Sequence, residues 1–242
     1  MVKELSPPVE TIGSDSSSTE TQTSESIPEY DLEEGLQILF EEIGGQLETK
    51  DVVIVLIAGG SCSGKTTVIA ERVRVKFDPN VRVLSMDDYY HGKTFMEVQA
   101  KCEKLINWDQ PEAVNLDLLR DHLEKLKRGE MIQKPVYDLE SSEPRSLENF
   151  DPAQIILVEG LFALTDELKE TGDIKVFIDI APNVAFARRI SRDPKRTGKK
   201  PGEIASYISE TVRPQYRRYV IPTRSNADLI INNSRYNPGV AK

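Results

Sequence analysis

A glycine-rich segment carries the clearest chemical signal in this sequence. It fits the pattern G-x-x-x-x-G-K-[ST], in which backbone N–H groups curl around the phosphates of a nucleotide. Glycine permits positive φ angles and a close approach of phosphate, and the helix that follows adds its positive dipole end. The residues predicted to bind ATP or GTP are Gly59, Gly60, Ser61, Cys62, Ser63, Gly64, Lys65, Thr66 and Thr67.

Two members of this segment have individual predicted roles. Lys65 is expected to bridge the β- and γ-phosphates, and the Thr66 hydroxyl is expected to occupy a Mg²⁺ position. The alternative is a glycine-rich turn with a surface lysine. An apolar run directly precedes the segment and a helical pattern directly follows it, and this context favours the phosphate loop.

Two carboxylates follow other apolar runs of the chain. Asp87 follows the run 81–85, and Glu159 follows the run 155–158. Ligands of open parallel sheets collect at the carboxyl ends of the strands, so both acids are expected near the phosphate loop. Asp87 suits a catalytic base that also contacts the metal, and Glu159 suits a metal-binding acid. Helix capping is the alternative for each, and Asp88 is expected to be a solvated neighbour.

The elements that must position these residues alternate between strand and helix patterns. A first helix is expected from Asp31, with Gly44-Gly45 ending it. Alternation of this kind predicts an α/β fold with a parallel sheet and helices on both faces. The long stretch 91–145 between the second and third strands is expected to be an insertion that carries substrate contacts. Strands are predicted at 52–58, 81–85, 155–158, 174–180 and 227–232, and helices at 66–77, 115–128, 182–192 and 201–219.

Composition divides the chain at residue 30. Residues 1–30 hold one Lys and six Asp or Glu, a net charge of −5, with seven Ser and four Thr. This segment is predicted to be a disordered tail, and residues 31–242 to be one kinase domain. The remaining charge of the −9 total is only −4, which argues against a nucleic-acid partner. No apolar run suits a membrane span, and two cysteines and no leader predict a cytoplasmic location.

Five motifs in register resemble the uridine kinase and phosphoribulokinase family, with the greatest similarity to uridine–cytidine kinases. The resemblance extends from about Val52 to Asn232. It implies a P-loop fold with a five-stranded parallel sheet, a basic lid, and transfer of the γ-phosphate of ATP to the 5′-hydroxyl of a nucleoside. The motifs are the phosphate loop, Leu84–Tyr90, Asn107–Ala113, Pro135–Asp138 and Val158–Gly160.

The resemblance also implies roles for individual residues. Asp87 is similar to the catalytic carboxylate, Asp109 to the acid that holds the ribose hydroxyls, and Tyr90 and Tyr137 to aromatic residues of the nucleoside pocket. Trp108 is expected in the core. Relatives often form homo-oligomers, although the sequence contains no interface signature.

A basic segment, residues 188–200, holds seven cations and one acid. A solvated face is the ordinary explanation for such a run. The family has a lid over ATP at this place, and cations there would stabilise the transferring phosphoryl group. Arg189 and Arg192 are the better catalytic candidates, because they keep the family's Arg-x-x-Arg-Asp pattern.

One departure from the family leaves the acceptor open. The family has a histidine after the Tyr-Asp pair, and residues 138–145 of this chain contain none. Of the two histidines in the chain, His91 is the remaining candidate for a contact with the acceptor, whereas His122 is expected to be structural or exposed. Uridine or cytidine is the leading acceptor. A sugar phosphate, pantothenate or nicotinamide riboside is the alternative, and a switch that binds a nucleotide without transfer is the third hypothesis. No Asn-Lys-x-Asp motif of a switch GTPase is present.

Overall fold

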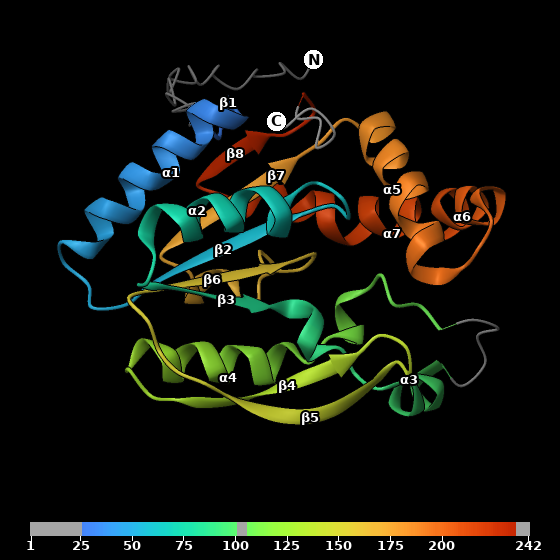
Figure 1. The fold of residues 1–242 in the computed structure, drawn as a ribbon, viewed down its shortest axis with the longest axis horizontal. Helices are drawn as coiled ribbons and strands as arrows, with labels where there is room; N and C mark the ends of the chain where they lie inside the picture. Colours follow the sequence, from blue (N-terminus) through green and yellow to red (C-terminus); the bar gives the residue numbers. More distant parts are fainter. Residues whose placement is uncertain (1–25, 101–105, 236–242) are drawn as a thin grey trace, which may run out of the picture.

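A parallel sheet forms the centre of the protein in the computed structural model, which describes residues 26–100 and 106–235 (Figure 1). The described strands of this sheet follow the order β1-β8-β7-β2-β6-β3, and a separate antiparallel pair is formed by β4 and β5. The strands are β1 (Glu29–Asp31), β2 (Val53–Gly59), β3 (Val81–Ser85), β4 (Ile132–Asp138), β5 (Glu143–Phe150), β6 (Ile155–Gly160), β7 (Ile174–Asp179) and β8 (Leu229–Asn232).

The helices lie on both faces of the sheet and beyond its carboxyl edge (Figure 1). The α-helices are α1 (Leu32–Leu47), α2 (Glu71–Phe77), α3 (Lys93–Ala100), α4 (Leu116–Lys127), α5 (Pro182–Thr197), α6 (Pro201–Tyr207) and α7 (Arg213–Gln215). Shorter 3-10 and π-helical elements connect them. These are η1 (Lys65–Ala70), η2 (Met86–Tyr89), η3 (Pro111–Ala113), η4 (Lys169–Thr171), η5 (Ile208–Val212), η6 (Tyr216–Val220) and η7 (Ile221–Asn226).

The central strand β2 is apolar throughout because the sheet has a hydrophobic core on each face. Ile54 and Leu56 belong to the core that α4 covers, whereas Val55 and Ile57 belong to the core that α1 and α2 cover. All four side chains are fully buried. A strand covered on both faces needs no alternation of polar and apolar residues, as the sequence indicated.

The predicted α/β class and parallel sheet are confirmed, and each predicted strand is present. The sheet has one strand more than the five expected, because β1 pairs in parallel with β8 at its edge. Glu29 and Tyr30 therefore lie in a strand, although they belong to the predicted tail, and the tail as far as residue 25 lies outside the described residues. The domain boundary at residue 31 stays a prediction.

The expected end of the first helix at Gly44-Gly45 is wrong. Helix α1 continues to Leu47, and Leu47 packs against the core beneath α1 and α2. Glycine costs only about 1 kcal/mol in a helix interior, which packing of an apolar side chain can offset. The N-terminus of the helix follows its sequence signal, since the Asp31 carboxylate accepts the N–H groups of Glu33 and Glu34 at 3.1 Å.

The insertion between β3 and β6 forms a small lobe of α3, α4 and the β4–β5 hairpin (Figure 1). A buried polar pair joins α4 to η2, in which the Tyr89 hydroxyl lies 2.8 Å from Nδ1 of His122. His122 is buried, and burial lowers the pKa of its ring. The prediction of a structural His122 is therefore confirmed.

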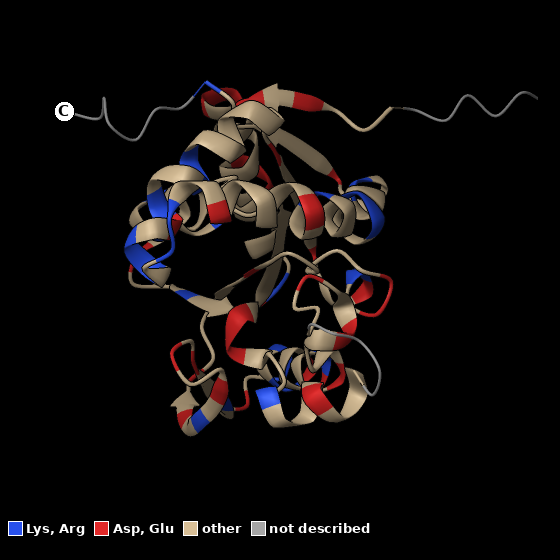
Figure 2. Cartoon of the chain, turned by 90° about the vertical axis from the view of Figure 1, so that its right-hand side faces the viewer, with Lys and Arg blue, Asp and Glu red and all other residues tan. Residues whose placement is uncertain are grey.

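Charge is distributed without a dominant sign over the described residues. Figure 2 shows Lys and Arg as well as Asp and Glu on both the upper and the lower parts of the chain. Within ranges 26–100 and 106–235, no helix has the length and apolar character that crossing a membrane requires.

Candidate functional site

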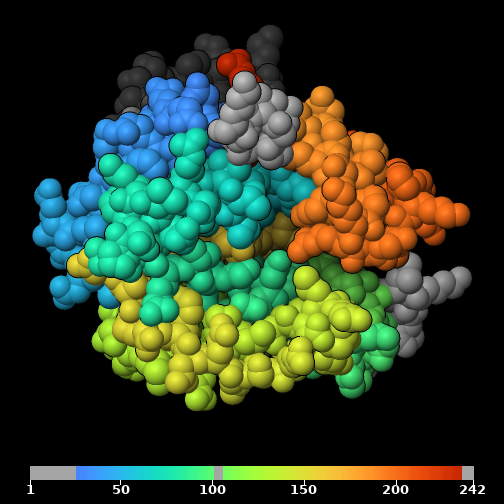
Figure 3. Space-filling model, in the orientation of Figure 1, coloured from blue at the N-terminus to red at the C-terminus, as the bar shows by residue number. Residues whose placement is uncertain are grey.

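A pocket of about 730 Å³ lies beyond the carboxyl ends of β2, β3 and β6. Figure 3 shows it as a hollow between the orange segment that contains α5 and α6 and the green segments of the insertion. The lining residues come from the phosphate loop, the ends of β3 and β6, η2, the insertion, the basic segment and α6. They are Ser61, Cys62, Gly64, Lys65, Thr66, Thr67, Ser85, Asp87, Tyr90, Trp108, Asp109, Tyr137, Leu139, Ser142, Glu159, Gly160, Leu161, Arg189, Arg192, Arg196, Thr197 and Tyr207.

The phosphate loop has the backbone that its sequence predicts. Gly59, Cys62 and Gly64 have positive φ angles of 146°, 63° and 98°. A Cβ atom on Gly64 would collide with the side chain of Asn233, whose amide donates to the Ser63 carbonyl at 2.6 Å. Glycine at position 64 is therefore required both by its conformation and by this contact.

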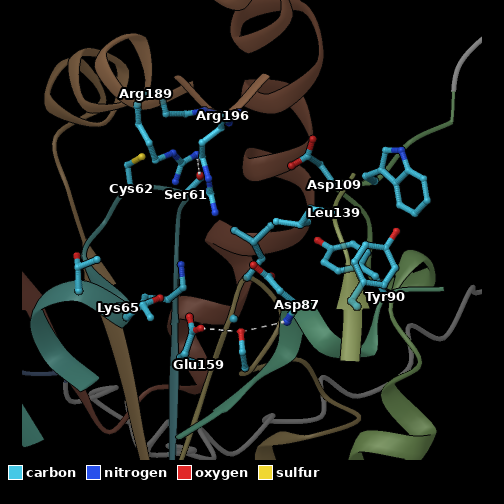
Figure 4. A pocket seen from close by; sticks show the side chains of 18 of the residues that line it. Ser61, Cys62, Lys65, Asp87, Tyr90, Asp109, Leu139, Glu159, Arg189 and Arg196 are labelled. Atoms are coloured by element: carbon cyan, nitrogen blue, oxygen red, sulfur yellow. Dashed lines mark hydrogen bonds between the residues drawn. The ribbon is translucent and has the colours of Figure 1, made fainter. Parts of the chain in front are cut away.

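Lys65 begins the helical segment η1 at the floor of the pocket (Figure 4). Its Nζ donates to the carbonyl oxygens of Gly59 and Gly60 at 2.9 and 3.0 Å. Burial lowers the pKa of this ammonium, and the nearby carboxylates Glu159 and Asp87 act in the opposite direction. A buried cation surrounded by backbone of the loop is suited to an anionic ligand.

The two predicted carboxylates lie together beside Lys65 (Figure 4). Ser85 joins them: its hydroxyl donates to Glu159 Oε1 at 2.8 Å and accepts the Asp87 N–H at 3.4 Å. Although Asp87 is open to the pocket, the surrounding protein reduces its solvation and raises its pKa, and the charge of Glu159 adds to this. A carboxylate with a raised pKa is a good proton acceptor for catalysis.

These oxygen atoms also suit Mg²⁺, which prefers hard oxygen ligands. Across the two described ranges, no group of three or more His, Cys, Asp or Glu could hold a metal ion. Mg²⁺ in nucleotide sites is held by one or two carboxylates together with phosphate oxygens and water, so the pair Glu159 and Asp87 with the Thr66 hydroxyl fits that ion.

The expectation that Asp88 is a solvated neighbour is wrong. Its side chain is only 23% exposed and forms an ion pair of 2.6 Å with Lys134. It also accepts the backbone N–H of Tyr137 at 3.3 Å. Asp88 points away from the pocket because adjacent residues of η2 face different sides.

The opposite wall of the pocket is aromatic and contains one carboxylate, Asp109. The Tyr90 ring lies 6.1 Å from the Trp108 ring and 5.9 Å from the Tyr137 ring, centre to centre. Trp108 therefore lines the pocket and is not a core residue. A β-bridge between Tyr90 and Val114 ties the segment that carries Trp108 and Asp109 to η2.

Helix α6 contributes a residue to this wall that the sequence did not single out. The Tyr207 hydroxyl donates to Asp109 Oδ2 at 3.3 Å, and Lys199 lies 5.8 Å from the centre of the Tyr207 ring. Burial raises the pKa of Asp109, whereas Arg189 and the Tyr207 hydrogen bond lower it. Burial also raises the pKa of Tyr207 to about 12, so its phenol stays a donor.

The basic segment forms the C-terminal part of α5 and ends at Lys200, directly before α6. Its residues Arg189, Arg192 and Arg196 line the pocket, and Figure 4 shows Arg189 and Arg196 there. Asp193 is buried and accepts from Arg189 at 2.9 Å and from Arg192 at 2.8 Å. Burial acts to raise the pKa of Asp193, but these hydrogen bonds outweigh it and the pKa is lowered. Arg192 also donates to the Ser61 hydroxyl at 3.2 Å, so the segment is joined to the phosphate loop.

Some predicted residues are in the pocket, and others are near it. Gly59, Gly60 and Ser63 belong to the loop backbone but do not line the pocket, and every other predicted site residue does. His91 does not line it and stacks on Phe95 with ring centres 4.1 Å apart. Besides Trp108, the pocket residues that the sequence reasoning missed are Ser85, Leu139, Ser142, Gly160, Leu161, Arg196, Thr197 and Tyr207.

Four of the missed residues had a visible signal in the sequence. Arg196 and Thr197 lie within the basic segment, Gly160 ends the motif Val158–Gly160, and Ser85 directly precedes the predicted acid-bearing turn. Leu139, Ser142 and Tyr207 carry no signal of their own, because each reaches the pocket through the packing of the insertion or of α6.

Comparison with known proteins agrees with this arrangement. Residues 54–238 match the model of the phosphoribulokinase / uridine kinase family. A uridine kinase of Brevibacillus brevis is 36% identical over 76% of this chain and 86% of its own length. A uridine kinase of Bacillus pumilus is 37% identical over 74% of this chain and 85% of its own length.

A solved structure shows the same fold at low sequence identity. Phosphoribulokinase from Rhodobacter spheroides superposes with a TM-score of 0.58 at 16% identity, over 80% of this chain and 76% of that one. The fold, the phosphate loop and the family match agree, and this chain belongs to the phosphoribulokinase / uridine kinase family.

Proposed function

We propose that this protein transfers the γ-phosphate of ATP to the 5′-hydroxyl of a nucleoside, with uridine or cytidine as the acceptor. The observation that carries the proposal is one pocket with Lys65 and Asp87 at its floor and Asp109 on an aromatic wall. The relatives in Brevibacillus brevis and Bacillus pumilus are named uridine kinases, which supports a pyrimidine nucleoside.

The donor half of the site holds the triphosphate of ATP. The N–H groups of the loop and the Lys65 ammonium bind the β- and γ-phosphates. The Thr66 hydroxyl, Glu159 and Asp87 would hold Mg²⁺, which would neutralise charge on the phosphates. Arg189, Arg192 and Arg196 stabilise the charge that develops on the phosphoryl group.

The acceptor half of the site positions and activates the hydroxyl. Asp87 accepts the proton of the 5′-hydroxyl. At the same time the hydroxyl oxygen forms a bond to the γ-phosphorus, and the bond between the γ-phosphorus and the leaving ADP oxygen breaks. Asp109 accepts hydrogen bonds from the ribose hydroxyls. Tyr90 and Tyr137 pack against the base, since aromatic rings offer large apolar faces to a planar ring.

The second candidate is a kinase of the same family with a different hydroxyl acceptor, a sugar phosphate, pantothenate or nicotinamide riboside. One observation favours keeping it: the segment after Tyr137 lines the pocket with Leu139 and Ser142, where uridine kinases have a histidine. A site that lacks a base-reading hydrogen bond discriminates less strongly between bases.

A coupled ADP-release assay decides between these functions. The full chain is assayed with Mg²⁺, with ATP or GTP, and with uridine, cytidine, other nucleosides and non-nucleoside alcohols. Uridine- or cytidine-dependent ADP release supports the proposal. Activity with another acceptor alone moves the assignment to the second candidate. ADP release that no acceptor raises above background contradicts the kinase function and favours a nucleotide switch.

Tyr207→Phe is expected to raise the KM for uridine about 3- to 10-fold with little change in kcat. The phenol donates to Asp109 at 3.3 Å. A hydrogen bond to a charged group contributes about 1.5–3 kcal/mol, but this bond is long and exposed to solvent, so only part of that free energy is expected here. Steady-state kinetics at saturating ATP measure the effect. Tyr219→Phe, on η6 and not among the pocket residues, is the matched control, and an unchanged uridine KM in Tyr207→Phe contradicts the assigned contact.

A further inference from the structure

A charged group with no part in the proposed chemistry lies behind the pocket. Lys134, on β4, has a side chain only 8% exposed, and its Nζ is 2.6 Å from Asp88 and 2.7 Å from Glu148. It does not line the pocket. Burial acts to lower the pKa of this ammonium, but the hydrogen bonds to the two carboxylates outweigh it and the pKa is raised. Lys134 is therefore a buried lysine whose charge two carboxylates stabilise.

Both oxygen atoms of the Asp88 carboxylate form contacts with strand β4. Oδ2 binds Lys134 Nζ, and Oδ1 accepts the N–H of Tyr137 at 3.3 Å. The register of β4 and β5 shifts between Val136 and Tyr137, so β4 departs from regular pairing where it meets Asp88. One side chain of η2 thus holds β4 at two points, three residues apart.

This contact joins the two halves of the proposed site. Asp87 precedes Asp88 within the four-residue 3-10 helix η2, and Tyr137 belongs to β4. Both line the pocket. A 3-10 helix of this length has poor internal hydrogen bonding, so its orientation depends on contacts with its neighbours. The Tyr90 and Tyr137 rings, 5.9 Å apart, meet across the same boundary.

We propose that Lys134 is a positioning residue, which through Asp88 fixes the turn that carries Asp87 against the strand that carries Tyr137. The catalytic carboxylate and the acceptor wall then keep one relative geometry as the acceptor binds. The roles of Asp87 and Tyr137 rest on the function proposed above, whereas the mechanical connection rests on the two contacts of Asp88 with β4.

A buried ion pair is costly to break from one side, because the remaining charge has no partner. Lys134→Met leaves the Asp88 carboxylate without its partner, whereas Lys134→Arg keeps the positive charge. The double variant Asp88→Asn with Lys134→Met removes both charges, and the side-chain amide oxygen at position 88 can still accept the Tyr137 N–H. Lys125→Met is the matched control, since Lys125 forms an exposed ion pair of 2.7 Å with Asp121 on α4 of the same lobe.

Kinetics with uridine and ATP give the first measurement. A misplacement of about 1 Å can cost about 10²-fold in rate, so Lys134→Met is expected to lower kcat about 10- to 100-fold and to raise the uridine KM. The ATP KM is expected to stay within about twofold, because the phosphate loop is not attached to Lys134. Lys134→Arg should recover most of the loss, and the double variant should lose less than the product of the single losses.

Amide hydrogen exchange gives a second measurement that needs no enzymatic activity. In Lys134→Met, the amides of residues 85–90 and 134–138 are both expected to exchange faster, while residues 59–66 keep the wild-type rate. If Lys134→Met does not fold, Asp88→Asn replaces it and the same result is expected. Unchanged exchange, or a change equal to that of Lys125→Met, overturns the proposal. A wild-type chain with no kinase activity refutes only the proposed function, because the exchange result still decides the connection.

Discussion

Asp87→Asn is expected to lower kcat about 10²- to 10⁴-fold, the usual contribution of a general base. The asparagine keeps the size of the side chain but cannot accept the proton of the acceptor hydroxyl. The backbone N–H of residue 87 can still donate to the Ser85 hydroxyl, so the turn should keep its shape. Initial rates at saturating ATP and acceptor measure kcat, and isothermal titration with ATP measures donor binding, which should survive.

The control for this variant is Asp117→Asn on α4, where the same chemical change falls on a side chain that is 85% exposed. It should leave turnover unchanged, since surface substitutions have small effects. A kcat for Asp87→Asn within a few-fold of wild type would remove Asp87 from the role of base. A parallel loss of ATP binding would instead indicate that its main contribution is to the metal.

Lys65→Met is expected to lower kcat/KM for ATP about 10²- to 10³-fold, the range seen when one preorganised donor for a developing charge is removed. Lys65 is buried, and its ammonium interacts electrostatically with both carboxylates of the floor. Methionine preserves the length of the side chain but removes the cation that binds the phosphates. It also leaves the carboxylates of Asp87 and Glu159 without a countercharge. Both changes disfavour a bound triphosphate, so ATP affinity should fall together with turnover.

The contrast between the two variants is the sharper test. Asp87→Asn should separate turnover from ATP binding, and Lys65→Met should reduce both. Lys76→Met, at the exposed end of α2, controls for the loss of one positive charge on the same helical segment. Normal ATP affinity in Lys65→Met would mean that the loop binds phosphate through its backbone alone.

Local sequence signals were sufficient wherever neighbours in the chain decide the outcome. The phosphate loop is predictable because glycine at the positive φ of Gly64 and a lysine at the helix start are requirements of one short segment. The strands are predictable because a sheet covered on both faces selects apolar runs such as Val53–Gly59. The placement of Asp87 and Glu159 follows from the common edge at which parallel strands end.

Predictions from the local sequence failed where a contact with a distant part of the chain outweighs the local conformational preference. Helix α1 runs through Gly44-Gly45 because packing of Leu47 offsets the cost of the glycines. Strand β1 escapes prediction because Glu29–Asp31 is too short to show a period, and it exists through its pairing with β8. Asp88 reads as an exposed acid beside Asp87, yet it is paired with a lysine 46 residues further along the chain.

The sequence by itself therefore determined the nucleotide-binding chemistry, the parallel sheet that presents it, and the acids at the edge of that sheet. Only the tertiary structure decided how the acceptor wall is assembled, because Tyr207 contacts Asp109 across 98 residues of sequence and Lys134 contacts Asp88 across 46. Hydrogen bonds and ion pairs between distant segments depend on three-dimensional packing, and such pairs leave no periodicity in one sequence.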